Sequence, residues 1–316
     1  MMDKLPVVKV AAVQAEPVTL DRDASTEKAC RLIAEAASNG ASLVVFSEMF
    51  IPVFTNASIW GRGFAKWGSP NAQAAFARLW GNSVEIPGPI TERLGEAVQA
   101  AGVTLAIGVC ERVPHARTLY NTILFIGPDG SVIGRHRKLV PTNTERMIHG
   151  YGDGSTLTVF DTAAGKIGGL ICWENLMPLA RYALYSQGEQ IHVASTSDDS
   201  EMAIVNARNT AFEGGVFVVS VANLIRKASY PSDFEFADEL AAASDDVIDG
   251  GTCIIAPDGR LLVGPVYKEE AILYADLDLN ETVMAGQLFD VAGHYSRPEV
   301  LGLRLTREPY TAVAAG

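Results

Sequence analysis

The amino-acid sequence predicts an α/β protein with mixed sheets, and two observations support this prediction. Short apolar runs rich in β-branched residues recur along the 316 residues, with helical patterns between several of them, as expected for alternating strands and helices. Two Pro-Asp-Gly turn sequences, at 127–130 and 256–259, each lie between apolar runs. Such turns join antiparallel strands, so the expected sheet is mixed rather than purely parallel.

The predicted strands are the runs with the highest content of Val, Ile and Leu, which is typical of buried strands. They cover residues 7–13, 42–46, 104–109, 122–126, 168–171, 191–194, 216–221 and 252–255.

Three segments have the spacing of amphipathic helices. In the first, Asp21 or Asp23 can serve as the N-cap, and the pattern ends at Asn39, which precedes a glycine. Its apolar residues recur at a spacing of three and four and so form one stripe. The segments 91–100 and 178–187 have the same character.

Two segments depart from this regular alternation. Residues 54–83 contain three tryptophans and several glycines, and residues 229–250 contain seven carboxylates and no basic side chain. Solvated loops are one interpretation of these two excursions. The other is that they form subunit contacts or the rim of a pocket, where aromatic and charged side chains gather.

Composition excludes several classes of protein. A formal net charge of -12 without a dense basic block argues against a nucleic-acid partner. The four cysteines stand far apart, without CxxC or paired histidines, so we expect neither disulfides nor a metal site. The first residues lack a basic segment followed by an apolar run, and no apolar run approaches about 18 residues. We therefore expect a cytoplasmic protein that does not span a membrane.

Cys172 is the first candidate for chemistry. It directly follows the predicted strand 168–171 and precedes a helical stretch, so its thiol lies at a strand-to-helix turn. Backbone N–H groups at such a turn favour a thiolate and any oxyanion formed beside it, which is typical of a nucleophile. An inert buried cysteine is the alternative, and the motif alone leaves both open.

Glu48 and Lys138 are candidate partners. Glu48 follows a predicted strand and is flanked by Met49, Phe50 and Ile51; apolar neighbours raise a carboxyl pKa, which suits a general base. Lys138 ends a basic run and precedes an apolar stretch. We expect Lys138 to point inward, with Arg135 and Arg137 facing out; a loop-start Glu and a solvated basic face are the alternatives.

Taken together, these segments resemble the carbon–nitrogen hydrolase (nitrilase) superfamily. Phe-Ser-Glu at 46–48, His-Arg-Lys-Leu at 136–139 and Leu-Ile-Cys-Trp-Glu at 170–174 stand in the order and approximate spacing of that superfamily's motifs. Cys-Trp-Glu is similar to the nitrilase branch proper, as are the segment 141–150 and the sequence at 293–298.

The resemblance implies a four-layer αββα sandwich formed by one domain over residues 1–316, with a core of about 7–280 and a C-terminal segment 281–316. It implies Glu48 as general base, Lys138 as cationic stabiliser, Cys172 as nucleophile and Glu145 as a fourth catalytic carboxylate. An ordinary helix-start Glu near Thr142 is the alternative for Glu145. No metal or organic cofactor is expected.

The resemblance also suggests which residues form the substrate pocket, namely Trp173, Phe54, His149 and Thr196. Two of them mark departures from the family pattern. Phe54 stands where many nitrilases have a nearby Tyr, and Thr196-Ser-Asp replaces the usual Trp-Pro. Both departures change the expected polarity of the pocket.

Three functions compete on this basis. The first is a nitrilase that converts an organic nitrile into a carboxylic acid and ammonia, and the second is an amidase or cyanide-processing relative. The third is a catalytically silent assembly protein, against which an intact set of Glu48, Lys138 and Cys172 argues. The resemblance further implies a homo-oligomer: a dimer through a helix-rich face, often extended into helical filaments through insertions at the two excursions.

Overall fold

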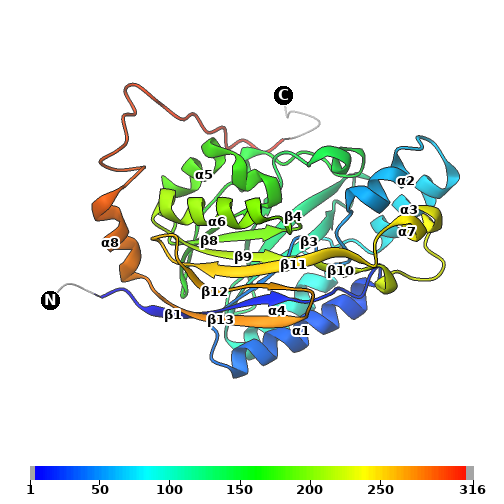
Figure 1. The fold of residues 1–316 in the computed structure, drawn as a ribbon, viewed down its shortest axis with the longest axis horizontal. Helices are drawn as coiled ribbons and strands as arrows, with labels where there is room; N and C mark the ends of the chain where they lie inside the picture. Colours follow the sequence, from blue (N-terminus) through cyan, green and yellow to red (C-terminus); the bar gives the residue numbers. More distant parts are fainter. Residues whose placement is uncertain (1–3, 311–316) are drawn as a thin grey trace.

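The computed structural model describes residues 4–310, and two β-sheets packed face to face form its centre (Figure 1). In the first sheet, β1, β2 and β3 are parallel, and the other neighbours are antiparallel. Its order is β13 (Ala271–Asp278), β1 (Val7–Gln14), β2 (Leu43–Phe46), β3 (Thr104–Arg112), β4 (Leu119–Ile126) and β5 (Val132–Arg137).

The second sheet also has a parallel centre, formed by β7, β8 and β9. Its order is β10 (Leu224–Arg226), β11 (Asp246–Ile255), β9 (Phe217–Ala222), β8 (Ile191–Thr196), β7 (Gly165–Ile171) and β6 (Phe160–Thr162), and β12 (Leu261–Tyr267) pairs with β11. Both predicted turn sequences join antiparallel pairs, β4 with β5 and β11 with β12. The predicted mixed sheets are confirmed.

Helices cover the outer face of each sheet, as Figure 1 shows. The first sheet packs on α1 (Arg22–Ser38) and α4 (Pro89–Ala101), and the second on α5 (Pro178–Tyr185) and α6 (Glu201–Gly214). Between the sheets lies an apolar core that includes Val10, Val45, Ile171, Val193 and Val219. The predicted four-layer αββα sandwich is therefore confirmed.

The predicted elements are all present, with small shifts of their ends. Asp21, rather than Asp23, caps α1 by accepting the N–H of Ala24 at 2.9 Å. The strands β5, β6, β10, β12 and β13 were not predicted, nor were the helix α6 and the helices within residues 54–83, 229–250 and 280–288. Most residues of β12 and β13 are only partly buried, so these two strands lack the apolar run that marked the central strands.

The two excursions fold and pack on each other at one end of the molecule (Figure 1). Residues 54–83 contain a π-turn (Ala57–Gly61), α2 (Arg62–Phe64) and α3 (Pro70–Gly81), and residues 229–250 contain α7 (Ala237–Ala242). The buried Trp60 donates its Nε1–H to the Tyr230 hydroxyl at 3.1 Å and packs on Phe234. The interpretation as solvated loops is therefore wrong.

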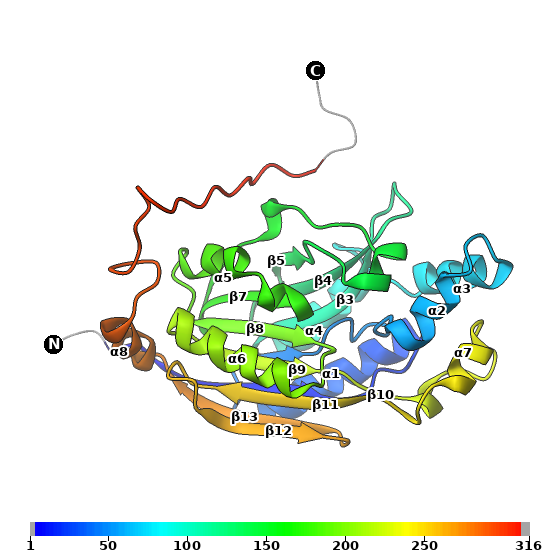
Figure 2. The ribbon, with the colours of Figure 1, turned by 45° about the horizontal axis from the view of Figure 1, so that its top comes forward.

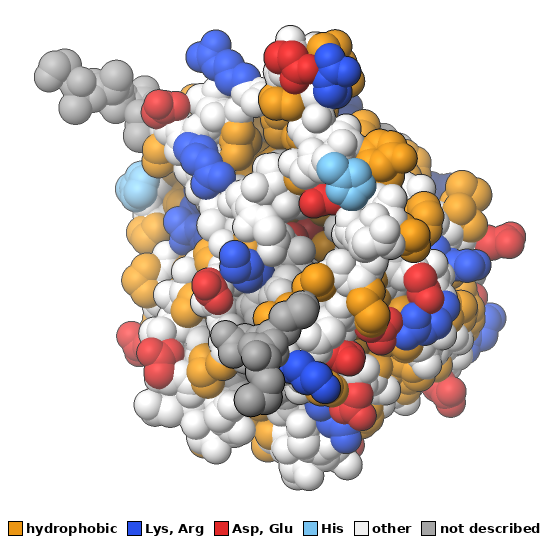
Figure 3. Space-filling model, turned by 90° about the vertical axis from the view of Figure 1, so that its left-hand side faces the viewer, with side chains coloured by type: hydrophobic (Ala, Val, Ile, Leu, Met, Phe, Trp, Pro, Cys, Tyr) orange, Lys and Arg blue, Asp and Glu red, His pale blue; other side chains and the backbone are white. Residues whose placement is uncertain are grey.

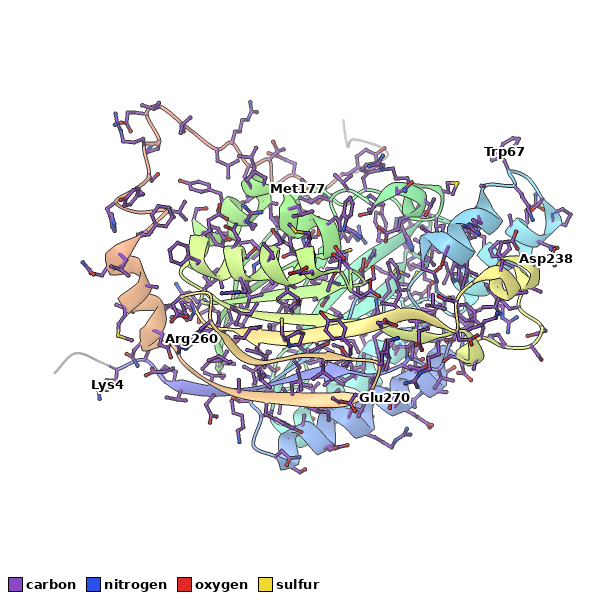
Figure 4. All side chains as sticks on the ribbon, in the orientation of Figure 1. Lys4, Trp67, Met177, Asp238, Arg260 and Glu270 are labelled. Atoms are coloured by element: carbon purple, nitrogen blue, oxygen red, sulfur yellow. The ribbon has the colours of Figure 1, made fainter. Side chains whose placement is uncertain are left out.

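The C-terminal segment begins at the opposite end with α8 (Asn280–Leu288) and continues as an extended chain past α5 (Figure 2). Leu303 and Leu305 pack against the cluster beneath α5. Figure 3 shows the α8 end, where acidic and basic side chains are interspersed. Arg260, labelled in Figure 4, joins Asp258 to Glu281 there and so ties α8 to the β11–β12 turn.

Candidate active site

Cys172 directly follows β7 and begins a 3₁₀ turn, Cys172–Leu176. Its φ is +54°, in the left-handed region, which costs a non-glycine residue about 1–2 kcal/mol. The side-chain amide of Asn175 offsets this by donating to the carbonyls of Cys172 at 2.9 Å and Leu170 at 3.2 Å. The predicted strand-to-helix turn is therefore present, and it holds the thiol in a fixed, largely buried position.

Glu48 lies at the end of β2 and is fully buried. Its Oε1 accepts from Lys138 Nζ at 2.9 Å and from Asn121 Nδ2 at 2.7 Å. Its Oε2 has no hydrogen-bond partner among the described residues. Burial raises the pKa of Glu48, and the positive charge of Lys138 opposes that rise only in part. The direction agrees with the prediction from its apolar neighbours.

Lys138 follows β5 and is also buried. Its Nζ donates to Glu48 and, at 2.7 Å, to Glu145 Oε2. Burial alone would lower the pKa of Lys138, but the neighbouring negative charges outweigh it and the net pKa is raised. The ammonium therefore keeps its charge. The predicted inward orientation of Lys138 is confirmed.

The neighbouring arginines differ from the expectation that they face out. Arg137 donates from Nε to Glu111 at 2.9 Å, and Arg135 lies 3.1 Å from the same carboxylate. Both arginines are only partly exposed, because the buried Glu111 holds them against the sheet.

Glu145 lies in the 3₁₀ turn Asn143–Met147, where it both caps the turn and contacts Lys138. Its Oε2 accepts the backbone N–H of Thr142 at 2.6 Å, as a capping carboxylate does, and also binds Lys138. Its Oε1 accepts from Asn121 Nδ2 at 3.1 Å. Burial acts to raise the pKa of Glu145, but Lys138 and the local hydrogen bonds lower it overall. This carboxyl therefore stays ionised.

The electrostatics of Cys172 differ from the sequence expectation of a favoured thiolate. Burial, followed by the negative charge of Glu48, raises the pKa of Cys172 to about 11. Lys138 and the backbone N–H of Ser197 act in the opposite direction but do not outweigh them. The resting group is a thiol, so its use as a nucleophile requires a base.

Besides Asn175, two further residues around the cluster were not predicted as site residues. Asn121 in β4 bridges Glu48 and Glu145. Glu174 accepts hydrogen bonds from the backbone N–H groups of Ile171 and Leu139, and its Oε2 lies 3.0 Å from His136 Nε2. The available signal for Asn121 was its position within an otherwise apolar strand. The motif position of Glu174 gave no indication of its partners.

A cavity of about 400 Å³ opens on Cys172. Predicted pocket residues Phe54 and Trp173 line it together with Glu145, and Val247 and Ile248 complete an apolar side. A smaller cavity of about 280 Å³ meets it at Cys172, Trp173 and Asp198. Both excursions thus contribute to the rim, as the second interpretation of them predicted.

The other two predicted pocket residues lie elsewhere. Thr196 lines the smaller cavity, between the second sheet and α6. His149 lines neither of these two cavities; it is buried behind the larger one, with Nε2 3.1 Å from Thr55 Oγ1. Burial lowers the pKa of His149 to about 4.

The fold and this cluster define an αββα-sandwich protein with a Cys, a Lys and two Glu side chains at the meeting of two sheets. Comparison with known proteins agrees with that class. The chain belongs to the carbon–nitrogen hydrolase family, whose model matches residues 9–286.

Named relatives match nearly the whole chain. A bifunctional nitrilase/nitrile hydratase of Lupinus angustifolius is 43% identical, covering 98% of this chain and 88% of its own. Nitrilase 2 of Arabidopsis thaliana is 40% identical, covering 96% of this chain and 90% of its own. Among solved structures, Saccharomyces cerevisiae Nit3 matches with a TM-score of 0.69 at 20% identity, over 92% of this chain and 97% of that one. That structure supports the fold.

Proposed function

We propose that this enzyme hydrolyses an organic nitrile to the carboxylic acid and ammonia, with Cys172 as nucleophile, Glu48 as general base, and Lys138 and Glu145 as supporting charges. The nitrilase names of its relatives support this substrate class. One observation carries the chemical part of the proposal. Glu48 is held by Lys138 and Asn121 through one oxygen, while its other buried oxygen has no partner in the described part of the chain. That oxygen can accept the proton of the Cys172 thiol.

In the first step, Glu48 takes the thiol proton as the Cys172 sulfur attacks the nitrile carbon. A carbon–sulfur bond forms, one π bond of the nitrile breaks, and the proton passes to the nitrogen to give a thioimidate. The fixed charge of Lys138 stabilises the negative charge that develops on that nitrogen. The raised pKa of Cys172, about 11, is why the base is needed.

In the later steps, two waters enter. The first adds to the thioimidate carbon, and the tetrahedral species expels ammonia to leave a thioester. The second hydrolyses the thioester, releasing the carboxylic acid and returning the proton to the thiol. Glu48 and Glu145 are the carboxylates that can activate these waters, and Glu145 keeps Lys138 in place between them.

Release of an amide is a second outcome, because several relatives carry the name bifunctional nitrilase/nitrile hydratase. The tetrahedral species gives the amide if sulfur leaves instead of ammonia. Both outcomes share the first step and the same four residues. The ratio of acid to amide therefore reports which group leaves.

The test is product analysis with a nitrile panel and the matching amides. The panel is phenylacetonitrile, 3-phenylpropionitrile, benzonitrile, fumaronitrile and cyanide, with Cys172→Ala as control. We expect ammonia and acid from organic nitriles with the wild type and none with the variant. Release only from amides would replace the proposal with an amidase, and turnover of cyanide alone would replace it with a cyanide-processing enzyme. Formation of neither acid nor amide from any of the compounds would favour the silent assembly protein.

We propose further that the enzyme is a homodimer that pairs through α5 and α6. Apolar side chains on this helix-rich face are exposed, with 67% of Leu179, 65% of Met202 and 57% of Phe212 open to solvent. Such side chains are typical of an interface core. We expect Phe212→Asp to yield a single-subunit mass in light scattering where the wild type gives two or more.

We also propose that dimers associate further into a helical filament through the excursion of residues 54–83. Trp67 is 97% exposed at its tip, away from the sheets (Figure 4). We expect Trp67→Ser to remove any species larger than a dimer and to leave the dimer intact. A wild-type mass equal to one subunit would contradict both assembly proposals.

We propose the cytoplasm as the location. Four free cysteines fit a reducing compartment. Among residues 4–310, none of the helices combines the length and apolar character that crossing a bilayer requires.

A further inference from the structure

A buried chain of side chains lies beneath Cys172, and the proposed reaction does not use it. Glu189 Oε1 lies 3.0 Å from His192 Nδ1, and His192 Nε2 lies 2.7 Å from Asn175 Oδ1. The Asn175 amide then donates to the carbonyls of Leu170 and Cys172. The side chains of Glu189 and His192 are fully inaccessible to solvent. The chain therefore ends on the backbone of the proposed nucleophile.

The donors and acceptors of this row of side chains fit together in only one order. Both carbonyls need donors, so the amide nitrogen of Asn175 must face them and its oxygen must face His192. His192 Nε2 must then carry a hydrogen. Glu189 at Nδ1 meets that requirement, either as a carboxylate beside an imidazolium or as a protonated carboxyl that donates to Nδ1. In both cases the pair keeps the Nε2–H pointed at Asn175.

The cost of burying Glu189 indicates that the pair does more than fill space. Its Oε2 has no hydrogen-bond partner among the described residues, and an apolar side chain would avoid that penalty. The neighbouring strand makes room for the carboxylate with a glycine. A Cβ on Gly168 would lie only 2.3 Å from Glu189 Oε1.

We propose that Glu189 and His192 are positioning residues that act through Asn175 to hold Cys172 in its left-handed conformation, and so aim the thiol at the substrate carbon. The positive φ of Cys172 is the feature that needs such support. Arg181 Nη1, 2.6 Å from the carbonyl of Asn175, fixes the Asn175 backbone. The side chain of Asn175 is thus the link that His192 controls. The role rests on the proposed function of Cys172.

A matched pair of variants tests this proposal. In His192→Gln the side-chain nitrogen takes the place of Nε2 and still donates to Asn175. In His192→Asn the shorter side chain takes the place of Nδ1 and reaches only Glu189. We expect His192→Gln to keep kcat within about threefold, and His192→Asn to lower kcat by about tenfold to a hundredfold with KM changed less than about twofold. A role in burial alone would affect both polar variants alike.

A double-mutant cycle shows whether the effect passes through Asn175. We expect Asn175→Ala to lower kcat as His192→Asn does, and the double variant to be no worse than Asn175→Ala. Additive losses, or equal kcat values for His192→Gln and His192→Asn, would overturn the proposal. If His192→Asn does not fold, Glu189→Gln and Glu189→Met give the same comparison, because only Gln can bond Nδ1.

A second readout needs no substrate. The rate at which iodoacetamide alkylates Cys172, followed by mass spectrometry, should fall in His192→Asn and not in His192→Gln. If the wild type hydrolyses neither nitriles nor amides, the proposed function fails while this comparison still decides the positioning role. Equal alkylation rates in the two variants would reject it.

Discussion

The backbone N–H of Leu139 donates to the Glu174 carboxylate at 2.5 Å, which joins the residue after Lys138 to the residue two positions after Cys172. The same carboxylate accepts the N–H of Ile171 at 2.8 Å and lies 3.0 Å from His136 Nε2. Glu174 is buried, and its oxygens have these three partners. One side chain therefore holds the β5 and β7 ends at a fixed separation, which sets the position of the lysine relative to the thiol.

Glu174→Gln should lower both stability and turnover. An amide NH₂ cannot accept, so at least one backbone N–H loses its partner, at a cost of about 1–3 kcal/mol. We expect the free energy of unfolding in urea to fall by about 2 kcal/mol and kcat to fall with it, because Lys138 is no longer held. Glu27→Gln, on the exposed face of α1, is the control and should change neither. An unchanged kcat would show that Glu174 supports the fold alone.

Glu48→Gln should separate hydrolysis from thiol reactivity. The variant lacks the proposed base, so we expect turnover to be lost. The negative charge of Glu48 is, after burial, the main cause of the raised pKa of Cys172. Removing it should lower that pKa, and iodoacetamide alkylation should reach its half-maximal rate at a lower pH than in the wild type. An unchanged or higher midpoint would contradict this electrostatic account.

His149 should make the protein less stable in acid. Its pKa is lowered from 6.5 to about 4 in the folded protein, chiefly by burial and against the opposing charge of Glu145. Below pH 6.5 the unfolded chain binds a proton that the folded chain does not, so stability falls as the pH drops from 6.5 to 4. The full difference is about 3 kcal/mol. We expect His149→Gln to flatten the fall in unfolding free energy between pH 7 and pH 5; equal slopes would contradict it.

The sequence predicted those site residues whose local context determines their position. Glu48 follows the end of β2 in the first sheet, and Cys172 follows β7 in the second, so each was marked by the apolar strand before it. Lys138 was found through the apolar stretch after it. Asn121 was missed because its partners, Glu48 and Glu145, are 73 and 24 residues away. A single Asn in a strand carries no local sign of such contacts.

The charge state of Cys172 shows a second limit of local reasoning. The strand-to-helix turn favours a thiolate, but Glu48 and burial reverse that preference, and neither can be judged from residues 170–174. The excursions show the same limit. Their mutual packing around Trp60 depends on Tyr230, which is 170 residues away. Long-range contacts of this kind are set by the tertiary fold.

The larger cavity should discriminate by substrate charge. Glu145, Asp198 and Asp199 line it, and its lining includes no Lys or Arg among residues 4–310. Lys138 balances Glu145, whereas neither Asp198 nor Asp199 forms an ion pair among residues 4–310. An anionic group in this cavity is therefore repelled, and a cationic one is attracted. We expect kcat/KM to fall from (2-cyanoethyl)trimethylammonium through its neutral isostere 4,4-dimethylpentanenitrile to 3-cyanopropanoate.

Asp199→Asn provides the matched test of that order, because the amide oxygen can still accept the N–H of Asp249. Removing one unit charge near the substrate is worth about 1 kcal/mol, so we expect kcat/KM for 3-cyanopropanoate to rise about fivefold and that for the neutral nitrile to stay unchanged. Asp161→Asn, on the exposed strand β6, should alter neither, and added salt should reduce the difference between wild type and Asp199→Asn. If the wild type hydrolyses 3-cyanopropanoate as efficiently as the neutral nitrile, the charge of this cavity does not select the substrate.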